Sequence, residues 1–239
     1  RILKSNLKHN FNRAAKIYNQ NAILQQQVAK NLIDFCPPET KNYQKIIDLG
    51  SGTGFLYDLI SQNIKIPNFF SLDLAVSMLK QSNCNCNING DINLLPLKNN
   101  LFDLVISSLA LQWIDDYKQV FEQIHNILIK DGLFCFSIIA KNSLNNIKNV
   151  GINNLNINPF PDQEILKNYL KIFSSYKLIE KKITIKYDNY YCLLQSIKKI
   201  GAGYSVNKNS NLKISDLRKL MNIKNISENW NIIYVIAKK

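Results

Sequence analysis

The chain has 239 residues, 46% hydrophobic and 20% charged, which is typical of a globular protein with a single α/β core. Its longest apolar runs, such as LFCFSIIA at 133 to 140, are too short to cross a bilayer, so we expect no membrane contact and a cytoplasmic protein. The formal net charge of +13 indicates either an acidic partner or a general bias towards lysine, asparagine and isoleucine.

The N-terminal segment, residues 1 to 36, carries six basic residues before its first acid, Asp34. Apolar residues recur at helical spacing between 10 and 35, which predicts one amphipathic helix that ends at the two prolines after Cys36. A basic, acid-poor start is also typical of transit peptides, but this one is not rich in serine and has no secretory apolar stretch. We therefore interpret it as part of the mature fold.

The residues between 42 and 140 alternate between strand and helix patterns. KIIDLG, NFFSLD, FDLVISS and LFCFSII predict buried strands, and a short further strand is expected before GDINLLPL. FLYDLISQN, AVSMLKQS and YKQVFEQIHNILI predict helices, the last of them stopped by KDG at 130 to 132. This alternation predicts a mostly parallel, doubly wound sheet.

The chain beyond residue 140 has a weaker pattern. PDQEILKNYLKIF predicts a helix that begins near Pro161 and Asp162, KLIEKKITIKYD an edge or hairpin strand, and IIYVIAKK a final strand. Between these two strands, YYCLLQSIKKIGAG and KISDLRKLMNI predict helices that add nothing to a sheet. We interpret residues 189 to 228 as a helical cap on one domain that spans 1 to 239, and we expect a monomer.

The cysteines and histidines do not form a recognisable metal or disulfide pattern. There are five cysteines without a C-x-x-C pair, and His9 and His125 are the only histidines. We therefore predict no metal site and no disulfide framework, with Cys84 and Cys86 as ordinary loop thiols in a reducing compartment.

A glycine-rich turn follows the first strand in IIDLGSGTGFL. In a parallel sheet this turn holds a ligand at the carboxyl ends of the strands, and glycines let the backbone approach it closely; the alternative is a tight connection only. The spacing lacks the G-x-x-x-x-G-K of a phosphate loop and differs from the G-x-G-x-x-G of nicotinamide enzymes. Acids follow at the ends of successive strands, where Asp73 could accept from ribose hydroxyls and Asp91 from an adenine amino group.

This set of turn and acids resembles the class I S-adenosylmethionine-dependent methyltransferases, which implies a Rossmann-like fold and S-adenosylmethionine as cofactor. The resemblance places the amino-acid end of the cofactor in the turn, and it implies these binding residues: Asp48, Gly50, Gly52, Gly54, Asp73 and Asp91. Methylases of exocyclic amines carry a proline-containing turn after the fourth strand. Here that turn reads SSLALQW, which disfavours an amine acceptor.

A fuller resemblance covers most of the chain. FNRAAKIYNQNAILQQQVAKNLI at 11 to 33, residues 90 to 132, and LLQSIKKIGAG at 193 to 203 resemble the malonyl-acyl carrier protein O-methyltransferases, the BioC family. The resemblance implies methyl transfer to the free carboxylate of malonyl-acyl carrier protein, giving the ester used for pimeloyl formation in biotin synthesis. A malonyl carboxylate is already ionised near neutral pH, so this reaction needs no general base. Asn93 stands where many relatives have Glu, a departure that we expect to leave the cofactor acids untouched.

The resemblance also implies roles outside the turn, each with a structural alternative. Tyr18 and Gln25 fold over the cofactor, unless Tyr18 only packs in the core. Gln112 and Trp113 face the acceptor, unless Trp113 is a buried structural residue. Lys198 pairs with the malonyl carboxylate, unless it is solvated. Arg13 and Lys199, with Lys8, Lys16 and Lys198, form a basic surface for an acidic carrier.

Two other functions stay open at this point. One is O-methylation of another carboxylate or of a small molecule without a carrier. The other is a non-methylating S-adenosylmethionine-binding factor, as in the respiratory complex I assembly proteins that share the LPL and FDLVISS stretches. A nucleic-acid partner is supported by charge alone and is not expected.

Overall fold

The computed structural model describes residues 4–36, 43–62, 68–152, 155, 157, 159–205 and 212–239. Within these ranges a sheet of seven strands has the order β3-β2-β1-β4-β5-β7-β6. Strands β1 to β5 pair in parallel, and β7 runs antiparallel between β5 and β6. The strands are β1 Lys45–Leu49, β2 Asn68–Asp73, β3 Cys86–Asn89, β4 Phe102–Ser108, β5 Leu128–Ile139, β6 Ser175–Asn189 and β7 Lys224–Lys238. The predicted fold class is confirmed.

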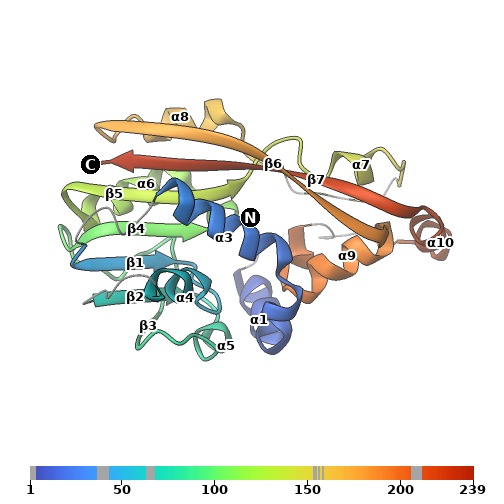
Figure 1. The fold of residues 1–239 in the computed structure, drawn as a ribbon, viewed down its shortest axis with the longest axis horizontal. Coiled ribbons are helices and arrows are strands. Elements are labelled where there is room, and N and C mark those ends of the chain that lie inside the picture. The colour runs from blue at the N-terminus through green and yellow to red at the C-terminus, as the bar shows by residue number, and fades with distance from the viewer. Residues whose placement is uncertain are drawn as a thin grey trace.

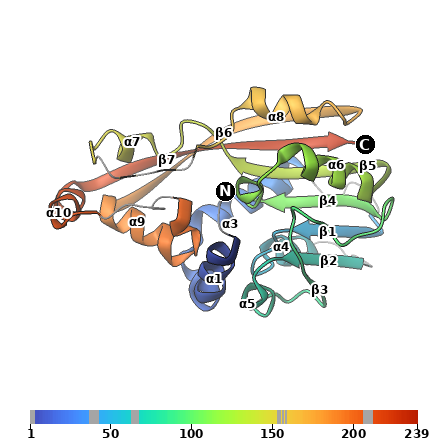
Figure 2. The ribbon, with the colours of Figure 1, turned by 180° about the vertical axis from the view of Figure 1, so that it is seen from behind.

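Helices cover both faces of the sheet (Figures 1 and 2). Side chains of α3 and α4 pack with Ile46 of β1 in one core cluster, and those of α6 and α8 pack with Ile47 in another. Adjacent strand residues point to opposite faces, so a continuous apolar strand such as β1 supplies both clusters. The helical segments are α1 Lys4–Ala14, η1 Ala15–Ile17, α2 Tyr18–Asn21, α3 Ile23–Phe35, α4 Phe55–Ser61, α5 Val76–Leu79, η3 Leu111–Trp113, α6 Tyr117–Ile127, α7 Asn145–Lys148, α8 Gln163–Leu170, α9 Tyr190–Lys199, η4 Ala202–Ser205 and α10 Ile214–Asn222.

The N-terminal helix is broken, whereas the sequence predicts one continuous helix from 10 to 35. The chain tightens into η1 and leaves helical geometry at Ala22, where ψ is 44°. Side-chain amides donate hydrogen bonds to backbone carbonyls at this break: Asn21 Nδ2 donates to Ile17 O, and Gln26 Nε2 donates to Asn19 O. The break lets α3 pack on the sheet while α1 lies beyond the carboxyl ends of the parallel strands (Figure 1). The helix ends at Phe35, and the prolines expected to stop it lie outside the described residues.

The KDG sequence does not stop helix α6, so that prediction is wrong. The helix begins at the side-chain cap of Asp116, as its pattern indicates, but ends at Ile127. Leu128 is already extended and pairs with Phe102 of β4. KDG instead lies within β5, where the pairing register shifts and Asp131 has a φ of 63°. The residues predicted to end the helix therefore form a β-bulge within β5.

The two helices predicted between the last two strands are present as α9 and α10, but residues 224–228 of the segment interpreted as a cap belong to β7. Strands β6 and β7 each run for 15 residues, well past the end of the parallel sheet, with α9 below them and α10 at their far ends (Figure 1). Asp162 caps α8 by accepting from Ile165 N, as Pro161 and Asp162 lead one to expect. None of the helices in the described ranges is long and apolar enough to cross a membrane.

A disulfide joins Cys36, after α3, to Cys135 in β5, across 99 residues of sequence. The prediction of no disulfide is therefore wrong; nothing in the sequence indicates this pairing, because it depends on how α3 crosses the sheet. Cys84, Cys86 and Cys192 are free, and Cys86 opens β3 instead of lying in a loop. The described residues include no cluster of three or more His, Cys, Asp or Glu able to hold a metal ion.

Candidate functional site

The glycine turn lies where the strand order reverses, between β1 and its neighbours β2 and β4. Gly50, Gly52 and Gly54 all have positive φ, at 72°, 57° and 88°. A Cβ on Gly50 would collide with the Ala110 side chain, and one on Gly54 with Ser82. A Cβ on Gly52 would meet nothing within 4 Å. The turn therefore offers open space at Gly52, as a cradle for a ligand requires.

Asp73, the last residue of β2, links the glycine turn to β2 by a hydrogen bond. Its Oδ2 accepts from Gly52 N at 2.8 Å and its Oδ1 from Ala75 N at 2.7 Å. Burial raises the pKa of the Asp73 carboxyl above its ordinary value, although the amide hydrogen bonds from Ala75 and Gly52 oppose the rise. With a further hydrogen bond from the Leu74 amide, about one lone-pair position stays free, so the ribose role predicted for Asp73 stays open.

Asp48, the last acid of β1, is buried with 1% of its surface exposed. Its Oδ1 has no hydrogen-bond partner among the described residues, and neither has the buried Ser51 Oγ beside it. Burial, and then the charge of Asp73, raise the pKa of Asp48 well above its ordinary value. An orphaned buried carboxylate oxygen is costly unless a donor arrives, and the ammonium of an amino-acid ligand is such a donor. With the open cradle at Gly52, this site fits the amino-acid end of S-adenosylmethionine.

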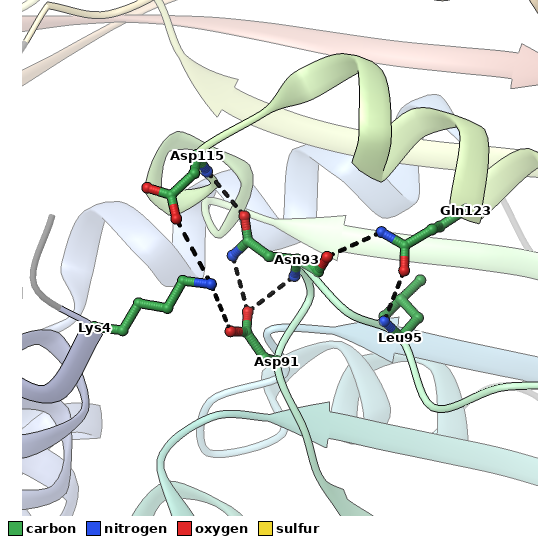
Figure 3. A network of polar contacts seen from close by, with 6 residues as sticks. All are labelled: Lys4, Asp91, Asn93, Leu95, Asp115 and Gln123. Atoms are coloured by element: carbon green, nitrogen blue, oxygen red, sulfur yellow. Dashed lines mark hydrogen bonds and ion pairs between the residues drawn. The ribbon is translucent and has the colours of Figure 1, made fainter. Parts of the chain in front are cut away.

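Asp91, after β3, is held by two other residues (Figure 3). Its Oδ1 accepts from Asn93 N at 2.9 Å and Asn93 Nδ2 at 2.8 Å, and its Oδ2 accepts from Lys4 Nζ at 2.8 Å. Burial acts to raise the pKa of the Asp91 carboxyl, but the bonds from Lys4 and Asn93 outweigh it and hold that pKa below its usual value. The expectation that the departure at Asn93 leaves the cofactor acids untouched is therefore wrong.

A hollow runs along the carboxyl ends of the strands, from the glycine turn to Asp91. Residues Leu7 and Phe11 of α1 close one side of it. A smaller hollow behind the turn contains Asp48, Ser51, Tyr18 and Gln25. We call the two together the cofactor hollow. The cofactor hollow thus brings together every cofactor residue that the sequence predicts except Gly54. Gly54 does not line the hollow but packs against Ser82.

A second space, the inner chamber, adjoins the cofactor hollow and shares Phe11, Tyr18, Gln25, Leu109 and Trp113 with it. None of its described lining residues is charged; the others are Gln112, Ile139, Phe160, Ile197, Ile200, Ala202 and Trp230. Gln112 Nε2 donates to Leu109 O at 2.6 Å, and its Oε1 is buried without a partner in the described structure. Burial, and then the charge of Asp73, raise the pKa of Tyr18, so its hydroxyl keeps its proton.

A third space, the basic groove, lies between α1 and the cap helix α9. Arg13, Lys198 and Lys199 line it together with apolar residues such as Ile17 and Leu194. The structure places Lys198 here and not among the described walls of the cofactor hollow or the inner chamber. Ile197, one residue earlier on α9, faces both the groove and the chamber. Lys8 lines the cofactor hollow instead of the groove.

Several residues of the site carry no sequence signal strong enough to predict them. Lys4 and Phe11 lie in a segment that reads only as basic and helical, and Trp230 lies 117 positions after Trp113 in a strand. Thr53 donates from its hydroxyl to Asn19 Oδ1 at 2.6 Å, which fastens the turn to α2. Only the folded arrangement of α1, α2 and β7 brings these residues to the site.

Known proteins resemble this chain along most of its length. A malonyl-acyl carrier protein O-methyltransferase of Hamiltonella defensa is 30% identical over 227 residues, covering 90% of this chain and 86% of that protein. The chain belongs to the malonyl-acyl carrier protein O-methyltransferase family. Another such enzyme, of Gallionella capsiferriformans, is 27% identical and covers 84% of this chain and 76% of its own. A methyltransferase domain model matches residues 47–136.

This malonyl-acyl carrier protein O-methyltransferase family member is therefore an S-adenosylmethionine-dependent O-methyltransferase, as predicted. The YcgJ protein of Bacillus subtilis has the same fold, with a TM-score of 0.65 at 13% identity, over 89% of this chain and 98% of that one. Human arginine-hydroxylase NDUFAF5 is 34% identical over 125 residues, which cover 51% of this chain but only 36% of the human protein.

Proposed function

We propose that the protein transfers the methyl group of S-adenosylmethionine to the free carboxylate of a malonyl group on an acyl carrier protein, and that the ester serves biotin synthesis. The observation that carries this proposal is the inner chamber, which adjoins the cofactor hollow and has no charged residue among its described walls. The names of the relatives from Hamiltonella and Gallionella support the same acceptor.

An uncharged chamber suits a carboxylate acceptor. A carboxylic acid of pKa about 4 is ionised at neutral pH, so it needs no base to become a nucleophile. When bound, S-adenosylmethionine supplies a methyl group on a positively charged sulfur. The apolar walls, such as Phe11 and Ile200, exclude water from the carboxylate, which strengthens its attraction to that positive charge. A lysine in the chamber would compete for the same carboxylate.

Tyr18 is the residue best placed to orient the acceptor, because it borders the cofactor hollow and the inner chamber. Its raised pKa keeps the hydroxyl protonated, so it acts as a hydrogen-bond donor and not as a base. In this proposal the Tyr18 hydroxyl donates a hydrogen bond to the carboxylate oxygen that does not receive the methyl group. Trp113 meets Phe11 edge to face, with ring centroids 5.9 Å apart, and forms the wall between the two spaces.

The basic groove is the proposed docking surface for the carrier. Acyl carrier proteins are acidic, and the exposed Arg13, Lys198 and Lys199 present positive charge beside Ile197, which also walls the chamber. In this arrangement Lys198 contacts the carrier and not the malonyl carboxylate. The carrier's flexible arm would enter past Ile197.

Methyl transfer to a set of acceptors tests the proposal. Labelled S-adenosylmethionine would be supplied with malonyl-carrier, malonyl-CoA, free malonate or unacylated carrier. We expect label on malonyl-carrier at least about tenfold faster than on malonyl-CoA, and none on the unacylated carrier. Equal rates with free malonate would favour a small-molecule carboxylate methyltransferase. No label on any acceptor, with cofactor still bound, would favour a non-methylating factor.

A further inference from the structure

An ion pair joins the first turn of α1 to the loop after β3, across 87 residues of sequence (Figure 3). Lys4 Nζ lies 2.8 Å from Asp91 Oδ2 and 3.6 Å from Asp115 Oδ2. Lys4 and Asp91 both line the cofactor hollow, at the end away from Asp48. The pair therefore belongs to the wall of the hollow and is not a remote surface contact.

The three hydrogen bonds to Asp91 leave little of its carboxylate free. Oδ1 takes both donors of Asn93, and Oδ2 takes Lys4. A carboxylate has about four lone-pair positions, so one remains, on Oδ2. Leu74 and Ile92 provide apolar surface in the same wall, as a flat aromatic base requires.

Asn93 is itself fixed from the opposite side (Figure 3). Its Oδ1 accepts from Asp115 N at 2.9 Å, and its backbone carbonyl accepts from Gln123 Nε2 at 3.1 Å. Gln123 Oε1 in turn accepts from Leu95 N, which connects the loop to α6. Asn93 thus holds Oδ1 rigidly, and Lys4 is the partner of Oδ2 among the described residues, so the orientation of the carboxylate depends on both residues.

We infer that Lys4 is a positioning residue for the cofactor, which holds the Asp91 carboxylate so that its remaining lone pair accepts from the adenine amino group. The inference rests on the assignment of Asp91 to adenine. Lys4 then acts through Asp91, and the effect has a definite sign: Lys4 raises the affinity for adenine. If Lys4 instead competed with the amino group for Oδ2, its removal would raise that affinity.

The test compares two ligands by calorimetry in the absence of any acceptor. One is S-adenosylhomocysteine, and the other is S-inosylhomocysteine, in which a carbonyl replaces the adenine amino group. We expect Lys4→Met to weaken S-adenosylhomocysteine binding about fivefold and to leave S-inosylhomocysteine nearly unchanged, because the lost hydrogen bond involves the amino group. Lys4→Arg keeps the charge and should retain most of the preference for adenine.

A matched control is available on the same helix. Lys8 lies one turn further along α1 and lines the same hollow, but it has no carboxylate partner among the described residues. Lys8→Met removes an equal charge and should leave the ratio of the two dissociation constants unchanged. Asp91→Asn should abolish the preference, and adding Lys4→Met to it should cause no further loss.

Three results would overturn the inference. Lys4→Met could weaken both ligands equally, which would mean that it only loosens α1. It could tighten S-adenosylhomocysteine, which would mean competition for Asp91. It could also add its full effect to Asp91→Asn, which would mean that it acts elsewhere. Because no acceptor is present, these outcomes are independent of whether malonyl-carrier is the substrate.

Discussion

At the residue scale, the site depends on a few residues that another amino acid could not replace, either because the backbone has a positive φ or because a buried carboxylate is needed. The three glycines and Asp48 were predictable, because the turn motif and its acid are contiguous in sequence. The double hydrogen bonding of Asp73 to the turn was not predictable, since it arises only when β2 lies beside β1. The same holds for Asn93, whose role depends on a network with residues on other elements.

The glycines Gly50 and Gly52 form a matched pair for substitution. Gly50→Ala should lower the free energy of unfolding by about 3 kcal/mol, because its Cβ collides with Ala110 at a positive φ. Gly52→Ala meets open space, so it should cost about 1 kcal/mol for its φ alone. Its methyl group projects into the cofactor hollow, so it should still weaken S-adenosylhomocysteine binding. Urea unfolding and calorimetry measure both effects, and equal destabilisation by the two variants would contradict the geometry.

Asp48→Asn should stabilise the cofactor-free protein at pH 7 by about 1 kcal/mol while weakening S-adenosylhomocysteine binding, since it removes an unpaired buried charge. Burial first, and the charge of Asp73 second, raise the folded pKa of Asp48 above the ordinary value of 3.8. The Asp48 carboxyl therefore stays protonated to a higher pH in the folded protein than in the unfolded chain. As pH rises from 3.8 to the folded pKa, the unfolded chain loses this proton first, so the contribution of Asp48 to the free energy of unfolding falls.

Urea unfolding of the wild type and Asp48→Asn between pH 4 and pH 8 measures this effect. The two proteins should be nearly equal at pH 4, and the variant should gain as pH rises. Parallel stability curves across that range would show that Asp48 is not a buried charge in the folded protein.

At the scale of elements, the alternating pattern predicted the strands and most helices because a buried parallel sheet imposes continuous apolar runs. Prediction failed where tertiary contacts override local pattern. Ala22 breaks the N-terminal helix so that α1 and α3 can take different directions, and β5 begins early because Leu128 pairs with β4. Gly201 is a further case, because it lies in a stretch predicted as helical but follows the end of α9, where it approaches Phe11 of α1 closely.

Gly201→Ala should disturb the cap without unfolding the core. Its φ is 82°, and a Cβ would lie 2.9 Å from Phe11 Cδ1 and 3.0 Å from Phe11 Cα. Gly203→Ala is the control, because its Cβ would make an ordinary contact with Lys198 at 3.4 Å. We expect kcat/KM for malonyl-carrier to fall about tenfold in the Gly201 variant only, as a displaced α1 opens the chamber to water. Equal activity of the two variants would mean that this contact is not needed for catalysis.

At the scale of the whole molecule, three neighbouring spaces share wall residues: Trp113 borders the cofactor hollow and the inner chamber, and Ile197 borders the inner chamber and the basic groove. The net charge alone did not distinguish a partner surface from a compositional bias. The structure gathers Arg13, Lys198 and Lys199 from two distant segments into one groove, which sequence order could not reveal.

Charge reversal tests the groove. Arg13→Glu with Lys199→Glu should lower kcat/KM for malonyl-carrier about tenfold at low salt, and the difference should shrink as salt increases. Lys177→Glu with Lys182→Glu places the same charge change on exposed positions of the edge strand β6 and serves as the control. If both pairs reduced the rate equally, net charge and not the groove would guide the carrier.

The central claim is that an already ionised carboxylate is methylated in a chamber that supplies no base. The most direct test is the single-turnover rate of methyl transfer to malonyl-carrier between pH 5.5 and 9, with cofactor saturating. We predict a flat profile across this range for both the wild type and Tyr18→Phe, with the variant slower by about tenfold through loss of the orienting hydroxyl. A rate that climbs about tenfold per pH unit through neutrality would require a titrating base and would contradict the account.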